Sequence, residues 1–254
     1  MPINTLNDND ELLRYMDFPK FMYLIHQDKL YFPRADCFDD KFEGYYTKKL
    51  YDINREIEAV DDPNNKGLYQ NTTIIRESAY VSCWTKCQYE SMAHWDIYGG
   101  KNSVAIIILV KELERQLDKA KHSNILSFME REIEAVEYID HHSIDEKLAK
   151  ELLKSRTAPL KKKNIAFEYE KEVRVIYNHM NQCFAKNGFN EKLGKGFNID
   201  IESSKLISRI IVSPKADNWF YTLVEKLISD YELPAIVERS KLHITPFEEA
   251  SENK

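Results

Sequence analysis

The chain is poor in the residues and patterns that mark several common protein classes. Its 254 residues include only 7 glycines and 4 cysteines. No window approaches the roughly 18 to 20 consecutive apolar residues of a membrane span. The opening residues, Met1-Pro2-Ile3-Asn4, show no charged-then-apolar leader. We therefore expect a cytoplasmic protein with reduced thiols and no membrane partner.

Several catalytic and binding motifs are also absent from the sequence. It contains no glycine-rich phosphate loop, no nucleophile elbow and no His-Glu-x-x-His helix. Cys83 and Cys87 lie four residues apart, but no second Cys or His pair accompanies them, so we expect no metal site. The net charge of −6 argues against a general affinity for nucleic acid. We expect nucleic acid as a partner only if it is the acceptor substrate of a transfer reaction. We expect the run Lys161-Lys162-Lys163 to be a solvated helix end or loop.

What the sequence does contain indicates an α+β fold. Hydrophobic residues make up 43% of the chain, enough for a substantial core. We predict one domain over residues 1–254, with a single mixed, mostly antiparallel sheet, flanking helices and a mainly helical excursion over 111–165. The predicted strands are 29–32, 79–85, 103–110, 134–140, 173–177, 207–213 and 235–239. The predicted helices are 18–28, 46–60, 91–98, 111–119, 142–155 and 217–230.

A run of carboxylates precedes one of the apolar strands. Glu168, Glu170 and Glu172 alternate along the sequence directly before Val173. Alternate side chains of a strand share a face, so like charges would crowd there. Either this is a solvated strand end, or a ligand binds at it. Arg174 lies on the same face as Glu172, and the two could form a purely structural ion pair.

Two further groups of residues combine polar and aromatic side chains. The first joins Arg14 and Tyr31 to the acidic loop 37–44, whose aromatic residues could line a site or plug the core. The second joins Ser82 to Trp84 and Tyr98. The rings of Trp84 and Tyr98 are typical of packing in a core or at its rim. Alternatively, the flat ring of a ligand could bind beside Ser82, between these aromatic side chains.

The three groups together resemble a mostly bacterial family known as domain of unknown function 2971. The resemblance is carried by Leu30-Tyr31-Phe32, Cys37-Phe38-Asp39-Asp40-Lys41-Phe42-Glu43-Gly44, Ser82-Cys83-Trp84-Thr85, Met92-Ala93-His94-Trp95-Asp96-Ile97-Tyr98 and Tyr169-Glu170-Lys171-Glu172-Val173-Arg174. This chain departs from the family pattern at Asp39-Asp40-Lys41, where Asn-Asp-Pro is usual, and at Val173, where Trp is usual. The family name implies no activity.

A weaker resemblance bears on chemistry. The order of an early arginine, a serine on a middle strand and a Glu-x-Glu before a late strand is similar to the arginine–serine–glutamate class of ADP-ribosyltransferases. It implies a small-molecule nucleotide, NAD, as substrate, with Glu172 as the catalytic carboxylate and Glu170 assisting an acceptor. Arg14 would hold the pyrophosphate or ribose beside Ser82, and Tyr31, Trp84 or Tyr98 would stack the nicotinamide.

These resemblances lead to one hypothesis and two alternatives. The hypothesis is an NAD-consuming, ADP-ribosyltransferase-like enzyme, an effector of a bacterial defence or toxin-type system. The first alternative is a metal-dependent phosphodiester hydrolase that uses Asp39, Asp40, Glu43 and the late carboxylates. The second is a non-catalytic interaction domain in which Glu172 and Arg174 form only a strand-end ion pair.

Overall fold

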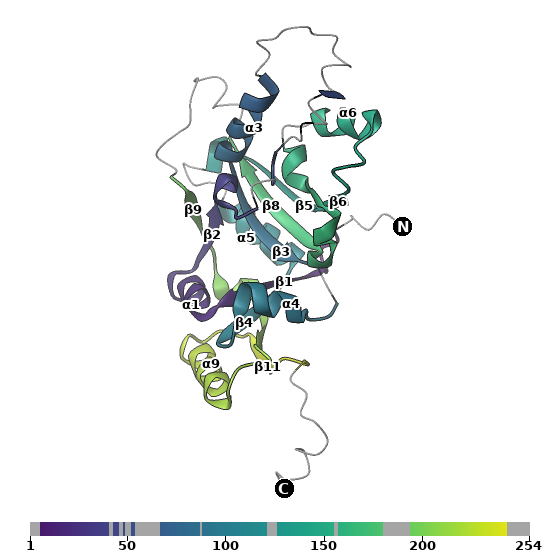
Figure 1. Ribbon diagram of the computed structural model, residues 1–254. Coiled ribbons are helices and arrows are strands. Elements are labelled where there is room, and N and C mark those ends of the chain that lie inside the picture. The colour runs from purple at the N-terminus through teal and green to yellow at the C-terminus, as the bar shows by residue number, and fades with distance from the viewer. Residues whose placement is uncertain are drawn as a thin grey trace, which may run out of the picture. The chain divides into compact units, whose positions relative to one another are not determined.

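The computed structural model describes residues 6–40, 43–45, 48, 52–53, 67–86, 88–120, 126–154, 157–179 and 194–242. Its hydrogen-bonded strands include a seven-stranded sheet in the order β11-β10-β4-β1-β3-β8-β5. Within this sheet, the strand pairs with a defined register are antiparallel, except β10 and β11, which run parallel. The separate pair of β6 and β7 is also parallel. Helices flank the sheet (Figure 1), and the predicted α+β class is confirmed.

The chain divides into two compact units, each assembled from three stretches of sequence. Unit 1 comprises residues 1–6, 31–84 and 120–199, and unit 2 comprises residues 7–30, 85–119 and 200–254. The sequence predicted one domain, and each unit is described separately below.

Unit 1 carries three strands of the large sheet and two small two-stranded sheets. Its large-sheet strands are β3 (Ala79–Thr85), β8 (Glu172–Asn178) and β5 (Glu130–Ala135). The small sheets pair β2 (Lys29–Pro33) with β9 (Gly196–Asp200), and β6 (Glu137–Ile139) with β7 (Lys162–Asn164). Its helices are η1 (Ala35–Cys37), α3 (Gly67–Ser78), η3 (Leu126–Phe128), α6 (Glu146–Lys154), η4 (Ala158–Lys161) and η5 (Ile165–Glu170).

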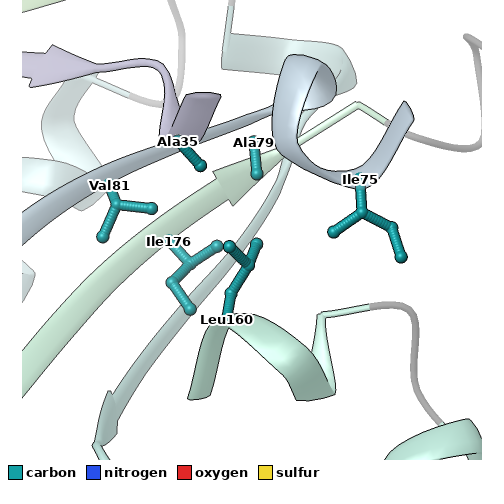
Figure 2. Packing of buried hydrophobic residues seen from close by; sticks show 6 residues of the cluster. All are labelled: Ala35, Ile75, Ala79, Val81, Leu160 and Ile176. Carbon is teal, nitrogen blue, oxygen red and sulfur yellow. The ribbon is translucent and has the colours of Figure 1, made fainter. Parts of the chain in front are cut away.

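One hydrophobic cluster of unit 1 fixes which way the strand side chains point. Figure 2 shows Ala79 and Val81 of β3 together with Ile176 of β8 and Leu160 of η4. Cys83 packs against the same cluster. Because side chains alternate along a strand, residues 79, 81 and 83 of β3 share one face of the sheet with residues 172, 174 and 176 of β8.

Aromatic side chains pack on the opposite face of the same two strands. The Tyr80 ring of β3 and the Tyr177 ring of β8 both contact Phe197, with centroids 4.9 and 5.9 Å away. Ser82 and Trp84 alternate with the cluster residues and therefore share this aromatic face. Both are buried, with Ser82 0% and Trp84 2% exposed.

Unit 2 is built on the most apolar strand of the chain. That strand, β4 (Ser103–Leu109), is buried along most of its length and lies between β1 (Glu11–Asp17) and β10 (Ile207–Val212), as expected for a central strand. The edge strand β11 (Ile236–Arg239) contacts α9 (Asn218–Asp230), and the two lie side by side in Figure 1. The remaining helices are α1 (Phe18–Gln27), α4 (Met92–His94), η2 (Trp95–Gly99), α5 (Val110–Ala120) and α8 (Ser203–Leu206).

Several sequence predictions need correction, and others lie outside the described residues. The strand expected at 134–140 is two strands, β5 and β6, separated at Val136. The segment 111–165, expected to be mainly helical, also contributes β5, β6 and β7. β9 and α3 were not predicted. The helix expected at 46–60 falls mostly on residues that the structure does not describe. Cys87 also lies outside the described residues.

Candidate functional site

The late carboxylates do not all lie on a strand. Glu168 and Glu170 belong to the 3₁₀ helix η5, and β8 begins only at Glu172. Between them Lys171 adopts the left-handed conformation, with φ 44°, and points to solvent. This residue turns the chain, so that Glu170 and Glu172 are both buried while Glu168 stays exposed. The expectation of three carboxylates on one strand face was wrong for this reason.

Arg174 anchors a buried ionic cluster in unit 1. Its Nε and Nη2 each donate to Glu172 over 2.8 Å, to Oε1 and Oε2 respectively, which is a bidentate pair. Its Nη2 also donates to Glu43 over 2.7 Å, and its Nη1 donates to the carbonyl of Leu160 over 2.8 Å. The side chain is only 1% exposed, and the Phe38 ring lies 5.9 Å from its guanidinium carbon.

Lys163 is the second cation of this cluster. Its Nζ lies 2.5 Å from Glu170, 3.0 Å from Glu43 and 3.5 Å from Glu172. The side chain is 7% exposed, with the Phe167 ring 4.7 Å from the ammonium. The expectation that Lys161-Lys162-Lys163 would be solvated was wrong for Lys162 and Lys163, which β7 carries into the interior.

Electrostatics keep Glu172 and Lys163 of the cluster ionised. Burial alone would raise the pKa of Glu172, but the charge and hydrogen bonds of Arg174 outweigh it and lower that pKa to about 2. Burial alone would lower the pKa of Lys163, but Glu172 and Glu43 outweigh it and raise that pKa above its ordinary value. At neutral pH, Glu172 is therefore an anion that cationic side chains hold in place.

Two weakly acidic groups complete the surroundings of Glu172. The Cys83 thiol is hydrogen-bonded to the Glu172 side chain, and burial raises the pKa of this thiol well above its ordinary value. The Tyr138 hydroxyl accepts the backbone N–H of Glu172 over 2.8 Å, and burial raises the pKa of Tyr138 to about 12. Both groups therefore stay protonated near Glu172 at neutral pH.

The cluster brings together residues from three separate motifs of the sequence. Glu43 comes from the acidic loop, Cys83 from the Ser-Cys-Trp-Thr strand, and Glu170, Glu172 and Arg174 from the late carboxylate segment. From the sequence, Glu43 was placed in the acidic loop and as a candidate metal ligand, and Lys163 and Tyr138 were not connected with the late carboxylates. No spacing rule links Lys163 to Glu170, because η5 and the left-handed Lys171 decide where their side chains meet.

The predicted substrate-binding residues are placed differently. Ser82 and Trp84 lie on the aromatic face of β3, opposite the face that carries Glu172, so the described structure does not bring the Ser82 hydroxyl to that carboxylate. Tyr31 is 44% exposed, and its hydroxyl lies above Gly196, where an added Cβ would be 2.1 Å away.

Two predicted residues belong to unit 2. Arg14 is half-buried on β1, in register with Ile106 of β4. Tyr98 is half-exposed on η2, and its ring lies 5.7 Å from that of His94. The predicted site residues are thus divided between the two units.

Over the described residues, no three His, Cys, Asp or Glu side chains gather closely enough to hold a metal ion. Glu43, the proposed ligand of a phosphodiester hydrolase, is instead bound by Arg174 and Lys163. None of the described helices is both long and apolar enough to cross a membrane.

The chain was compared with known proteins. No family model matches it, and no curated protein does. The geometry of the cluster is therefore the basis for assigning a function to this protein.

Proposed function

We propose that this protein is an NAD-consuming enzyme of ADP-ribosyltransferase type, with Glu172 as the catalytic carboxylate and Glu170 assisting the acceptor. The observation that carries the proposal is the meeting of Glu43, Glu170 and Glu172 around two buried cations. Buried ionisable groups with strongly shifted pKa values are enriched at functional sites.

The chemistry requires a carboxylate that is anionic when the bond breaks. Cleavage of the bond between nicotinamide and ribose passes through a cationic, oxocarbenium-like transition state. A pKa of about 2 keeps Glu172 ionised at neutral pH, and its low exposure strengthens its field at a nearby cation. The bidentate pair with Arg174 fixes its orientation, as preorganised electrostatic stabilisation needs.

Strand faces and side-chain exposure limit which of the other expected substrate-binding residues can belong to the proposed site. Ser82 and Trp84 are left out of it, because their strand face is opposite that of Glu172. Within unit 1, Tyr31 was expected to stack on the nicotinamide, and its ring is half-exposed, so a ligand could reach it. Arg14 belongs to unit 2 and is not part of this proposal.

The test is NAD hydrolysis by the purified protein and by Glu172→Gln, which keeps the size of the side chain but removes its charge. We expect a loss of roughly 2 to 4 kcal/mol of transition-state stabilisation. The matched control is Glu168→Gln, an exposed glutamate of the same segment, for which we expect the wild-type rate. Equal rates for folded Glu172→Gln and wild type would refute the role of Glu172.

A second candidate function is favoured by how deeply the cluster is buried. Arg174 is 1% exposed, and removing one partner of a buried ion pair costs about 3–5 kcal/mol, so the cluster could serve folding in a non-catalytic interaction domain. Under that function, Glu172→Gln lowers the melting temperature while wild-type protein neither binds nor consumes NAD. Calorimetry with NAD, run beside thermal unfolding, separates the two candidates.

A further inference from the structure

Lys163 occupies a central position in the ionic cluster. Its ammonium contacts carboxylates from three segments: Glu43 in the loop after η1, Glu170 at the end of η5 and Glu172 at the start of β8. Arg174 contacts Glu43 and Glu172, and no contact between Arg174 and Glu170 is found among the described residues. Within the described part of the chain, Lys163 is therefore the cation found in contact with both Glu170 and Glu172.

The local backbone makes this link necessary. The left-handed Lys171 turns the chain so that Glu170 and Glu172, two residues apart, both approach Nζ of Lys163. Two carboxylates this close repel each other, and the repulsion grows with burial. An ammonium between them replaces the repulsion with two attractions, and the Phe167 ring covers it on another side.

We propose that Lys163 is the positioning residue of the Glu170–Glu172 carboxylate pair, holding the two carboxylates close together through its ammonium. As a role in catalysis, this inference rests on the proposed function. Among the residues that the structure describes, the other charged or titratable groups found to face the pair are Glu43, Arg174, Cys83 and Tyr138. Of these Arg174 is the cation, and it contacts Glu43 and Glu172, so removing the charge of Lys163 takes away the cation found in contact with Glu170 in the described part of the chain.

The first measurement follows the ionisation of Glu172 directly. Protein labelled with ¹³C at glutamate is titrated by NMR, and the Glu172 carboxyl signal is assigned from its loss in Glu172→Gln. In wild type we expect this signal to stay in its ionised position down to about pH 4. In Lys163→Met we expect its midpoint to rise by about one pH unit or more. In Lys163→Arg, which keeps the charge, we expect the wild-type behaviour.

A neighbouring residue supplies the control. Lys162 lies on the same strand and is as buried as Lys163, but it binds Glu137 and Glu151 instead of the cluster. Lys162→Met should leave the Glu172 titration unchanged. Should Lys163→Met fail to fold, Lys163→Gln makes the same comparison, because its amide donates hydrogen bonds without carrying charge.

The second measurement is NAD turnover. We expect kcat of Lys163→Met to fall at least about tenfold with little change in KM, and the acid limb of its pH profile to move to higher pH. Lys163→Arg should recover most of the rate. An unchanged Glu172 titration in a folded, uncharged variant overturns the role of Lys163. Wild-type protein that consumes no NAD overturns the proposed function instead, and the titration still decides whether Lys163 holds the pair.

Discussion

Charged side chains deep in unit 1 are stabilised by one another. Arg174 uses four donor contacts, and Glu43 binds one cation with each of its carboxylate oxygens. A buried charge is costly unless it is paired and hydrogen-bonded, so each member depends on the others. The same arrangement fixes the orientation of Glu172, which is what electrostatic catalysis requires.

The shifted pKa of Glu172 makes a prediction for acid stability. Its pKa is about 2 in the folded protein, against an ordinary value of 4.5, so the ionised form favours folding. This contribution is fully present above pH 4.5 and is lost as the pH falls towards 2. We expect the free energy of unfolding, measured with urea, to decline over this range in wild type and to decline less steeply in Glu172→Gln.

The exposed Glu168 again supplies a comparison. Glu168→Gln should follow the wild-type pH dependence, because no ion pair of Glu168 is found in the described structure. A Glu172→Gln profile parallel to that of wild type would show that Glu172 does not contribute to the acid dependence.

At the scale of single elements, helix α1 illustrates how a local signal fixes a boundary. Asp17 is the N-cap, and its side chain accepts the backbone N–H of Lys20 over 2.8 Å. Pro19 follows within the first turn, where its missing N–H costs nothing. Phe21, Leu24 and Ile25 then form the buried face at helical spacing.

This cap supports a prediction about stability. Asp17→Ala should destabilise the protein by about 1 kcal/mol, because the N–H of Lys20 loses its acceptor. Asp17→Asn keeps a good capping residue and removes only the exposed ion pair with Lys20, so it should cost clearly less. If thermal or urea unfolding shows equal losses for both variants, the charge rather than the cap provides the stabilisation.

Helices and strands with a strong local sequence pattern were predicted well. Strands whose limits depend on pairing with distant segments of the chain were not predicted well. The helix at 18–28 and the strands at 79–85 and 103–110 are confirmed with small shifts at their ends. The division of β5 from β6 was missed, because Val136 donates its N–H to the Glu172 carbonyl and β6 then pairs with β7. Such pairing is a property of contacts distant in sequence.

At the scale of the whole molecule, the two units are interleaved along the chain. Each takes one stretch from near the start, one from the middle and one from later on. Within the sheet, β8 lies between β3 and β5, and β10 lies between β4 and β11. No single cut of the chain therefore separates one unit from the other.

This connectivity predicts that fragments fail to fold. Residues 120–254 contain β8 and β10 but lack β3 and β4, so each strand loses a neighbour and exposes apolar surface. We expect no cooperative urea transition in the circular dichroism of this fragment, in contrast to the full chain. A cooperative transition in the isolated fragment would contradict the prediction.

The sequence by itself determined the α+β class, most helices and strands, and the burial of central strands, because these follow from local periodicity. It also singled out Glu170, Glu172 and Arg174. Only the tertiary structure decided that Glu43, Cys83 and Lys163 join them and that Ser82 faces away. The reason is physical: strand alternation and a left-handed Lys171 set where side chains point, and the cost of burying charge decides which of them must meet.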